Sequence, residues 1–184
     1  MRAEERLKDS IFTWTRTGDL SVEHAAIKYK NFSGAPTDYN PGGGVRTFVL
    51  LLTEDIAEEL RMLGWNIKYH EPRQEGDYEY YFTEIVVRLD IVHPKIVLLT
   101  EKNGRFKPNN LRDDMVGTLD RIRAENFDVI IHPRENKKPG SKYRYKGYAR
   151  AVYATQAMED YFGGKYSDLD EYEEDNFSYN EEAF

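Results

Sequence analysis

The segment YEYYFTEIVVRLDI, residues 78–91, is the clearest expected strand in the sequence, because its side chains suit a regular two-residue alternation. Successive side chains of a strand point to opposite faces of a sheet. One face carries Tyr81, Thr83, Ile85, Val87, Leu89 and Ile91, and the other carries Tyr80, Phe82, Glu84, Val86, Arg88 and Asp90. Pro94 is expected to end the strand, because proline has no N–H to donate to a ladder.

Elsewhere in the chain the same signals predict mostly strands. Strands are expected at 22–32, 45–52, 65–72, 95–100, 127–133 and 143–156. A helix is expected at 53–64, and one helix or two short ones at 111–124, where Gly117 weakens the pattern. The content of Gly, Pro and Asn predicts a loop at 33–44 and a hairpin turn at 101–104. A short helix is expected near 157–162.

The order of these elements predicts the fold class. From residue 65 it is strand, strand, strand, helix, strand, strand, which is the order of a five-stranded Greek-key barrel of the OB type. We therefore expect a mainly β protein, an OB-fold-like barrel with one or two helices, in which the first 63 residues are an elaboration. A different small β-barrel and an α+β sandwich also fit this order. The expected divisions are an N-terminal arm or short helix at 1–20, the barrel domain at 21–165 and a disordered acidic tail at 166–184.

Composition excludes several classes of protein. The 184 residues contain no cysteine, which excludes disulfide scaffolds, thiolate metal sites and cysteine nucleophiles. No window approaches the ~18 uninterrupted apolar residues of a membrane span. The first residues show no apolar signal-peptide core, so we expect a soluble protein of the cytoplasm.

Charge is concentrated in two segments of opposite sign. Residues 166–184 hold eight acidic residues and no basic one, and a chain of that composition is expected to stay unfolded. Residues 134–150 hold seven basic residues and one acidic residue. The net charge of −7 therefore hides a basic segment inside a body that is close to neutral.

The basic segment predicts a nucleic-acid-binding surface. If no bulge intervenes, one face of the last strand carries Lys142, Arg144, Lys146, Tyr148 and Arg150. Cationic side chains can follow the phosphates of a single strand, and aromatic rings can stack on its bases. Neighbouring strands could extend this surface through Tyr80, Phe82, Arg88, Lys28, Lys30, Phe32 and Arg46. The alternative is an ordinary solvated sheet face with tyrosines in the core.

The acidic segment suggests a second interaction. It could occupy the basic surface when nucleic acid is absent, and bind other proteins when nucleic acid displaces it. The candidate partner-binding residues are Asp175, Glu181, Glu182 and Phe184, since a terminal Phe with its carboxylate suits an apolar pocket with basic groups. The alternative is a tail that serves only solubility.

The sequence resembles a family of small phage-encoded single-stranded-DNA-binding proteins with an OB-type fold. The tail resembles the acidic, Phe-terminated tails of bacterial and phage proteins of this kind. The residues that carry the likeness of the body are Asn31-Phe32-Ser33-Gly34, Tyr39-Asn40, Arg46-Thr47-Phe48, Gly64-Trp65-Asn66-Ile67-Lys68, Val116-Gly117-Thr118-Leu119-Asp120 and Asp128-Val129-Ile130-Ile131. The resemblance implies binding without base-specific readout, and a role in protecting or presenting single strands.

Together these features favour a non-enzymatic protein that binds single-stranded DNA in phage replication or recombination and recruits replication or recombination proteins through its tail. RNA as ligand and a homo-oligomeric state both stay open. One alternative is a phage inhibitor module whose tail mimics nucleic acid. Another is a metal-dependent nuclease, for which Asp128, Glu135 and Lys137 would be the motif. The four histidines show no metal-ligand spacing, so no metal or cofactor is expected.

Overall fold

The structure is a computed structural model that describes residues 2–157. Within these residues the strands are β1 (Ile11–Trp14), β2 (Leu20–Glu23), β3 (Ile27–Asn31), β4 (Arg46–Leu52), β5 (Lys68–His70), β6 (Tyr80–Val87), β7 (Lys95–Lys102), β8 (Arg105–Asn110), β9 (Asn126–Glu135) and β10 (Tyr145–Ala157). The helical segments are α1 (Ala3–Arg6), α2 (Glu54–Leu63) and two 3-10 turns, η1 (Leu7–Asp9) and η2 (Val116–Asp120). The prediction of a mainly β fold with one or two helices is confirmed. The expected acidic tail lies outside the described residues, as does nearly all of the helix expected near 157–162.

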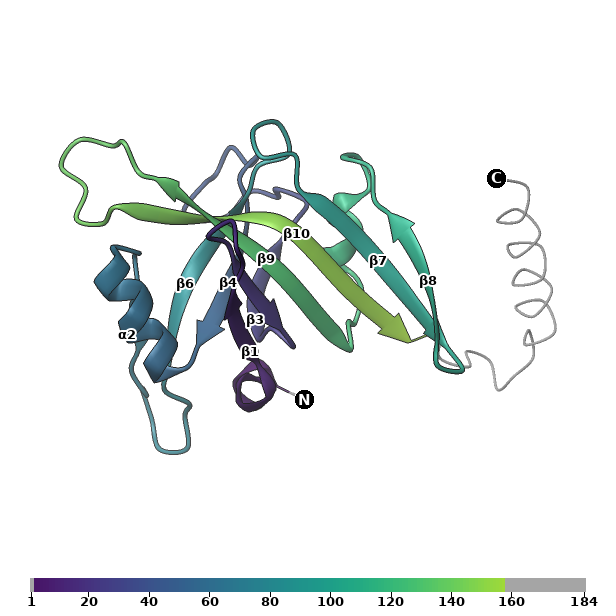
Figure 1. Cartoon of the computed structure of the whole chain (residues 1–184), viewed down its shortest axis with the longest axis horizontal. Helices are drawn as coiled ribbons and strands as arrows, with labels where there is room; N and C mark the ends of the chain where they lie inside the picture. The colour runs from purple at the N-terminus through teal and green to yellow at the C-terminus, as the bar shows by residue number, and fades with distance from the viewer. Residues whose placement is uncertain (1, 158–184) are drawn as a thin grey trace.

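The strands form one sheet that curls around a single main core (Figure 1). Its order is β1-β2-β9-β10-β6-β4-β3, and β2 and β3 are consecutive in the chain. Residues 20–31 therefore close a barrel, because one half of the segment pairs with β9 and the other half with β4. The chain bends between the halves at His24, whose φ is 54° and whose backbone N–H donates to Asp128 at 3.0 Å.

The barrel strands differ from the predicted set. The five positions are filled by residues 20–31, β4, β6, β9 and β10, in the order of an OB-type barrel. The expectation that the first 63 residues are an elaboration is wrong, because residues 20–52 supply the first two barrel strands. Strand β5 pairs only with β6, and β7 lies outside the barrel between β10 and β8. Strand β8 has mostly polar side chains, all exposed, and the sequence pattern did not predict it.

The helical predictions are confirmed at one position and wrong at the other. Helix α2 follows Thr53 and ends at Gly64, whose φ of 101° suits a glycine cap. The segment 111–124, expected to form one helix or two short ones, contains only the short 3-10 turn η2. There the Asp120 carboxylate accepts backbone N–H bonds from Phe32 at 2.8 Å and Ser33 at 2.9 Å, so η2 ties down the end of β3.

The longest strand, β10, joins three neighbours. It runs antiparallel to β9 along most of its length, while its other edge pairs first with β6 and then with β7. The register with β9 shifts between Ala149 and Ala151, so Arg150 forms a bulge where β10 passes from β6 to β7. Strand β10 therefore belongs to the barrel in its first half and to the β7–β8 extension in its second half (Figure 1).

Gly147 in β10 gives a test of the barrel packing. A Cβ at this position would lie 2.7 Å from Ile85 Cδ1, 2.8 Å from Trp65 Cζ3 and 2.9 Å from Ile131 Cγ2. We expect Gly147→Ala to lower the free energy of unfolding by about 1–3 kcal/mol, because the core has no room for the methyl group. Urea denaturation measures the change.

The matched control is Gly42→Ala, since Gly42 is exposed and nothing lies within 4 Å of its added Cβ. That variant should unfold at the same urea concentration as the parent protein. Equal stability of the Gly147→Ala variant and the control would contradict the packing described here.

Candidate nucleic-acid interface

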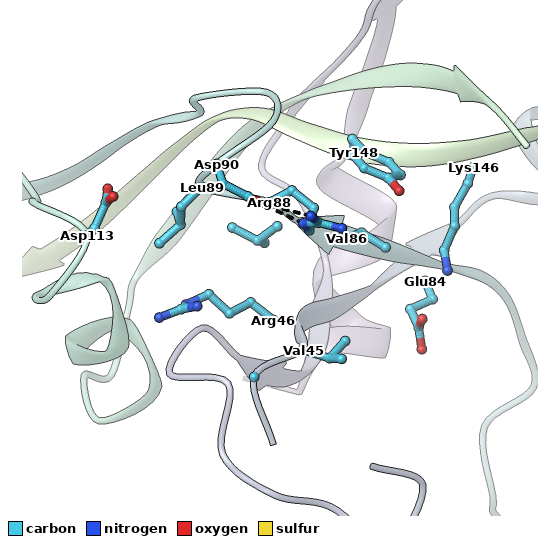
Figure 2. A pocket seen from close by; sticks show the side chains of 12 residues that line it. Val45, Arg46, Glu84, Val86, Arg88, Leu89, Asp90, Asp113, Lys146 and Tyr148 are labelled. Carbon is cyan, nitrogen blue, oxygen red and sulfur yellow. Dashed lines mark hydrogen bonds and ion pairs between the residues drawn. The ribbon is translucent and has the colours of Figure 1, made fainter. Parts of the chain in front are cut away.

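A groove of about 530 Å³ lies on the outer face of the barrel, where β4, β6 and β10 meet (Figure 2). Its cationic side chains are Arg46, Arg88 and Lys146, and its aromatic side chain is Tyr148. Val45, Val86 and Leu89 supply apolar lining. Four of the residues predicted from the sequence as nucleic-acid contacts thus lie together around one hollow.

The sheet register explains why these side chains meet. Tyr148 of β10 lies opposite Val86 of β6, so the two share a face. Lys146 lies two residues before Tyr148 in β10, and Arg88 follows the end of β6, two residues after Val86. Both side chains line the same groove. The opposite side of both strands is the core, where Ile85 and Ala149 are fully buried. The alternation predicted for both strands is therefore confirmed in this part of the sheet.

Arg88 does not face the groove as an unpaired charge. Its Nε and Nη2 donate to Asp90 at 3.0 and 2.9 Å, which is a two-pronged contact (Figure 2). The hydrogen bonds from Arg88 lower the pKa of Asp90 to about 2, and the same contact raises the pKa of Arg88. A phosphate in the groove could replace Asp90 on Arg88, because both are oxyanions that fit the guanidinium fork.

The groove also contains acidic side chains that the sequence analysis did not weigh. Glu84 and Asp113 line it together with Asp90. Arg46 is fixed at its rim, because Arg46 Nε donates to the carbonyl of Phe32 at 2.9 Å. The groove thus contains both positive and negative side chains. Any excess of positive charge on this face has to come from residues beside the groove.

Basic side chains extend this surface along the β9–β10 hairpin. Arg134 was not among the predicted contacts, although it lies in the basic segment; its guanidinium sits 5.4 Å from the centre of the Tyr148 ring. Arg134 lies directly opposite Lys146 in the β9–β10 ladder. A predicted register for this hairpin would have placed Arg134 on the same face as Lys146. Lys142 and Arg144 are exposed but precede β10, so they belong to the hairpin loop instead of the predicted strand face.

Arg150 lies apart from the other predicted cations, because it forms the bulge of β10. Its Nε donates to Asp19 at 2.8 Å, and its Nη2 lies 3.0 Å from Nδ1 of His132. Asp19 is buried, with 3% of its side chain exposed, and also contacts His132 at 2.8 Å. Burial of a carboxylate requires such partners. Arg150 therefore neutralises Asp19 and fixes the bulge, which corrects its predicted place beside Lys146.

The aromatic candidates from other strands are buried or partly covered. Phe32 is fully buried and packs on Phe48, with ring centres 5.5 Å apart, so it belongs to the core. Tyr80 is 7% exposed, and Phe82 is partly buried against it. These two lie on the predicted face, but Ala3 and Leu7 of the N-terminal helical segment pack over this cluster.

The two lysines of β3 are also engaged elsewhere. Lys28 pairs with Glu4 of α1 and lies 4.8 Å from the centre of the Tyr80 ring, within the same covered cluster. Lys30 donates to the carbonyls of Leu119 and Ile122, and burial lowers its pKa. In this structure the charged ends of both lysines hold the fold together, and their contact with nucleic acid stays a prediction.

The nuclease alternative gains no support from the described residues. Asp128 and Glu135 lie on the same strand, β9, and seven residues of a strand span about 23 Å. Two carboxylates so far apart cannot hold one metal ion. Residues 2–157 contain no group of three or more His, Asp or Glu side chains placed to bind a metal.

Over the same range no helix is long and apolar enough to cross a membrane. The tail candidates Asp175, Glu181, Glu182 and Phe184 lie outside the described residues.

The barrel topology defines an OB-type protein, and its outer groove is lined by basic, acidic, apolar and aromatic side chains. The sequence matches, over residues 10–183, the family described as "Putative phage ssDNA-binding domain". The chain belongs to this family, since the match covers almost its whole length. No curated protein matches the sequence.

Solved structures agree with the fold. The single-stranded DNA-binding protein from bacteriophage Enc34, in complex with single-stranded DNA, is similar with a TM-score of 0.54 and 13% sequence identity. The likeness covers 83% of this chain and 93% of that one. A second structure of the Enc34 protein has a TM-score of 0.49 at 10% identity, with 87% and 98% of the two chains covered. At these identities the likeness of the first structure shows a shared fold.

The contact between Arg88 and Asp90 gives a test of the groove geometry. In the parent protein we expect the Asp90 carboxyl to titrate near pH 2, and in Arg88→Gln to return toward its ordinary pKa of 3.8. The pKa is lowered, so the ion pair is present at neutral pH and is lost only as the pH falls through about 2. An NMR titration of side-chain carboxyl carbons measures both.

Asp77 is the internal control, because backbone N–H donors, the first of them Arg73, lower its pKa without Arg88. Its titration should be the same in both proteins. An Asp90 that titrates at its ordinary value in the parent protein would show that the pair does not form.

Proposed function

We propose that this chain binds single-stranded DNA without base-specific readout, through the outer groove, and carries out no catalysis. The observation that carries the proposal is that Arg46, Arg88, Lys146 and Tyr148 line one groove. Single strands offer regularly spaced phosphates and unpaired bases, and this combination of side chains suits both. Membership of the family and the DNA-bound state of the Enc34 structure support the same ligand.

The path of the strand would continue along the β9–β10 hairpin. Arg134 lies beside Tyr148, and Lys137, Lys138 and Lys142 are exposed in the loop beyond it. These cations would contact phosphates, while Tyr148 would stack on a base. Phosphate contacts release counterions, so binding should weaken steeply with salt.

The biological setting follows from this activity. We propose a role in phage DNA replication or recombination, with the binding domain reaching to residue 165. The acidic segment 166–184 would compete with DNA for the groove as a polyanion, and its Asp175, Glu181, Glu182 and Phe184 would bind replication or recombination proteins once DNA displaces it.

Substitutions in the groove test the binding mode. We expect Tyr148→Ala to weaken binding to a labelled oligo-dT by about 1–3 kcal/mol through lost stacking. Lys146→Ala should weaken binding and lower the slope of log affinity against log salt by about one, because one phosphate contact is lost. Fluorescence anisotropy over a salt series measures both quantities.

The matched controls are Tyr39→Ala and Lys8→Ala, which remove an exposed tyrosine and an exposed lysine that do not line the groove. Neither should change the affinity by more than the experimental error. Equal effects of the groove variants and their controls would refute this binding site, even if the protein binds DNA.

Removal of residues 166–184 tests the role of the acidic segment. We expect the chain 1–165 to bind oligo-dT more tightly than the full chain at low salt, with the difference shrinking as salt screens the competition. If neither chain binds at low salt, the DNA-binding proposal fails and the inhibitor alternative gains support. If both bind equally at all salt concentrations, the acidic segment does not compete for the groove.

A further inference from the structure

The outer sheet face continues past Tyr148 onto β9, where a histidine takes the next place. His132 lies directly opposite Tyr148 in the β9–β10 ladder, so the two side chains share the face that carries the groove. On the other edge of β10, Tyr148 lies opposite Val86 of β6 and lines the groove. His132 therefore flanks Tyr148 on the side away from Arg46 and Arg88.

The surroundings of His132 are built from a carboxylate and a guanidinium. Its Nδ1 lies 2.8 Å from Oδ1 of Asp19, whose side chain is 3% exposed. The other oxygen of Asp19 forms an ion pair with Nε of Arg150 at 2.8 Å. The side chains of His132 and Arg150 are themselves 35% and 48% exposed. Both can therefore reach a phosphate that lies beside Tyr148.

The contacts of Nδ1 decide which nitrogen carries the proton in the neutral ring of His132. Nδ1 also lies 3.0 Å from Nη2 of Arg150, but one ring nitrogen cannot both donate to Asp19 and accept from Arg150. The contact with Asp19 is the shorter one, and without a proton it would bring two lone pairs together at 2.8 Å. We therefore assign the proton of the neutral ring to Nδ1, which leaves Nε2 with a lone pair that repels a phosphate.

The surrounding charges set the conditions for a second proton on this ring. The groups that face His132 are Asp19 before β2, Tyr148 and Arg150 on β10, and Arg134 two residues away on β9. The negative charge of Asp19 is already balanced by Arg150, so a protonated ring would add an unbalanced positive charge. A phosphate supplies the missing negative charge, and a proton on Nε2 supplies a donor to that phosphate.

We propose that His132 and Arg150 bind a phosphate of the single strand next to the base that stacks on Tyr148, and that His132 takes up a proton as it does so. Nε2–H of His132 and Nη2 of Arg150 would donate to the phosphate, while Asp19 holds both side chains in place. The proposal rests on the proposed function, because the phosphate belongs to the same DNA strand. It adds a site on β9 beyond the groove and makes the affinity for DNA depend on pH.

The affinity of the full chain for a labelled oligo-dT, measured against pH at fixed salt, tests the site. A phosphate favours the charged ring, so the added affinity is present at low pH. It is lost as the pH rises through the range in which the ring in the complex releases its proton. We expect the affinity to fall roughly tenfold between about pH 5.5 and 8.5, as for loss of one hydrogen bond between charged groups. Fluorescence anisotropy measures this fall.

His132→Asn separates the phosphate contact from the structural role of the ring. The Asn amide can still donate to Asp19 but has no group at the place of Nε2. This variant should bind oligo-dT at every pH about as weakly as the parent protein does at the highest pH. The matched control is His24→Asn, which makes the same change outside the groove, at a φ of 54° that Asn tolerates. The control should keep the pH dependence of the parent protein.

Nitrogen NMR of the imidazole rings locates the proton in the unaltered chain. It should show the neutral ring of His132 protonated on Nδ1 in the free protein, and both nitrogens protonated once oligo-dT binds at neutral pH. A neutral ring protonated on Nε2 would overturn the proposal. So would oligo-dT binding that does not weaken as the pH rises, or that weakens equally in His132→Asn. These results leave the proposed function standing, whereas absence of oligo-dT binding at every pH overturns both.

Discussion

The pairing of β10 with three neighbours is the constraint on which the rest of the structure depends. Its first half completes the barrel between β9 and β6, and its second half pairs with β7. The register of β10 with β9 shifts at the bulge of Arg150, at the place where the other edge of β10 passes from β6 to β7. The buried carboxylate of Asp19 anchors that bulge through Arg150 and His132.

This constraint also places the outer groove. Before the bulge, β10 turns Gly147 and Ala149 into the core and Lys146 and Tyr148 outward beside β6. Outward side chains of β6 at its start are covered by the N-terminal helical segment, whereas those at its end remain open. Among residues 2–157, the groove thus lies on a part of the outer barrel face that the N-terminal helical segment leaves uncovered.

Much of this arrangement could be predicted from the sequence. Period-two alternation correctly gave the faces of β6 and of the start of β10, and Thr53 and Gly64 correctly marked the ends of α2. These features depend on neighbouring residues alone, which is why a local pattern is sufficient. Of the predicted contacts, Arg46, Arg88, Lys146 and Tyr148 line one groove as a result.

The errors came from interactions between distant residues. Phe32 follows β3, whose polar and aromatic side chains suggested an exposed face. The side chain of Phe32 is fully buried in the core because the barrel closes around it. Lys28 looks like a free cation until α1 brings Glu4 to it. The bulge at Arg150 has no signal in its own segment, and the carboxylate that holds Arg150 there is that of Asp19, more than a hundred residues earlier. Such contacts depend on topology, which a single sequence specifies weakly.

The most direct test of the account is a map of where DNA lies on the full-length protein. Backbone amide NMR signals would be followed while a short oligo-dT is added. The account predicts that the largest shifts occur at the end of β6 and the start of β10, around Arg88, Lys146 and Tyr148, and continue into the β9–β10 hairpin. Shifts concentrated on α2 or on β7 and β8, with the groove unchanged, would contradict it.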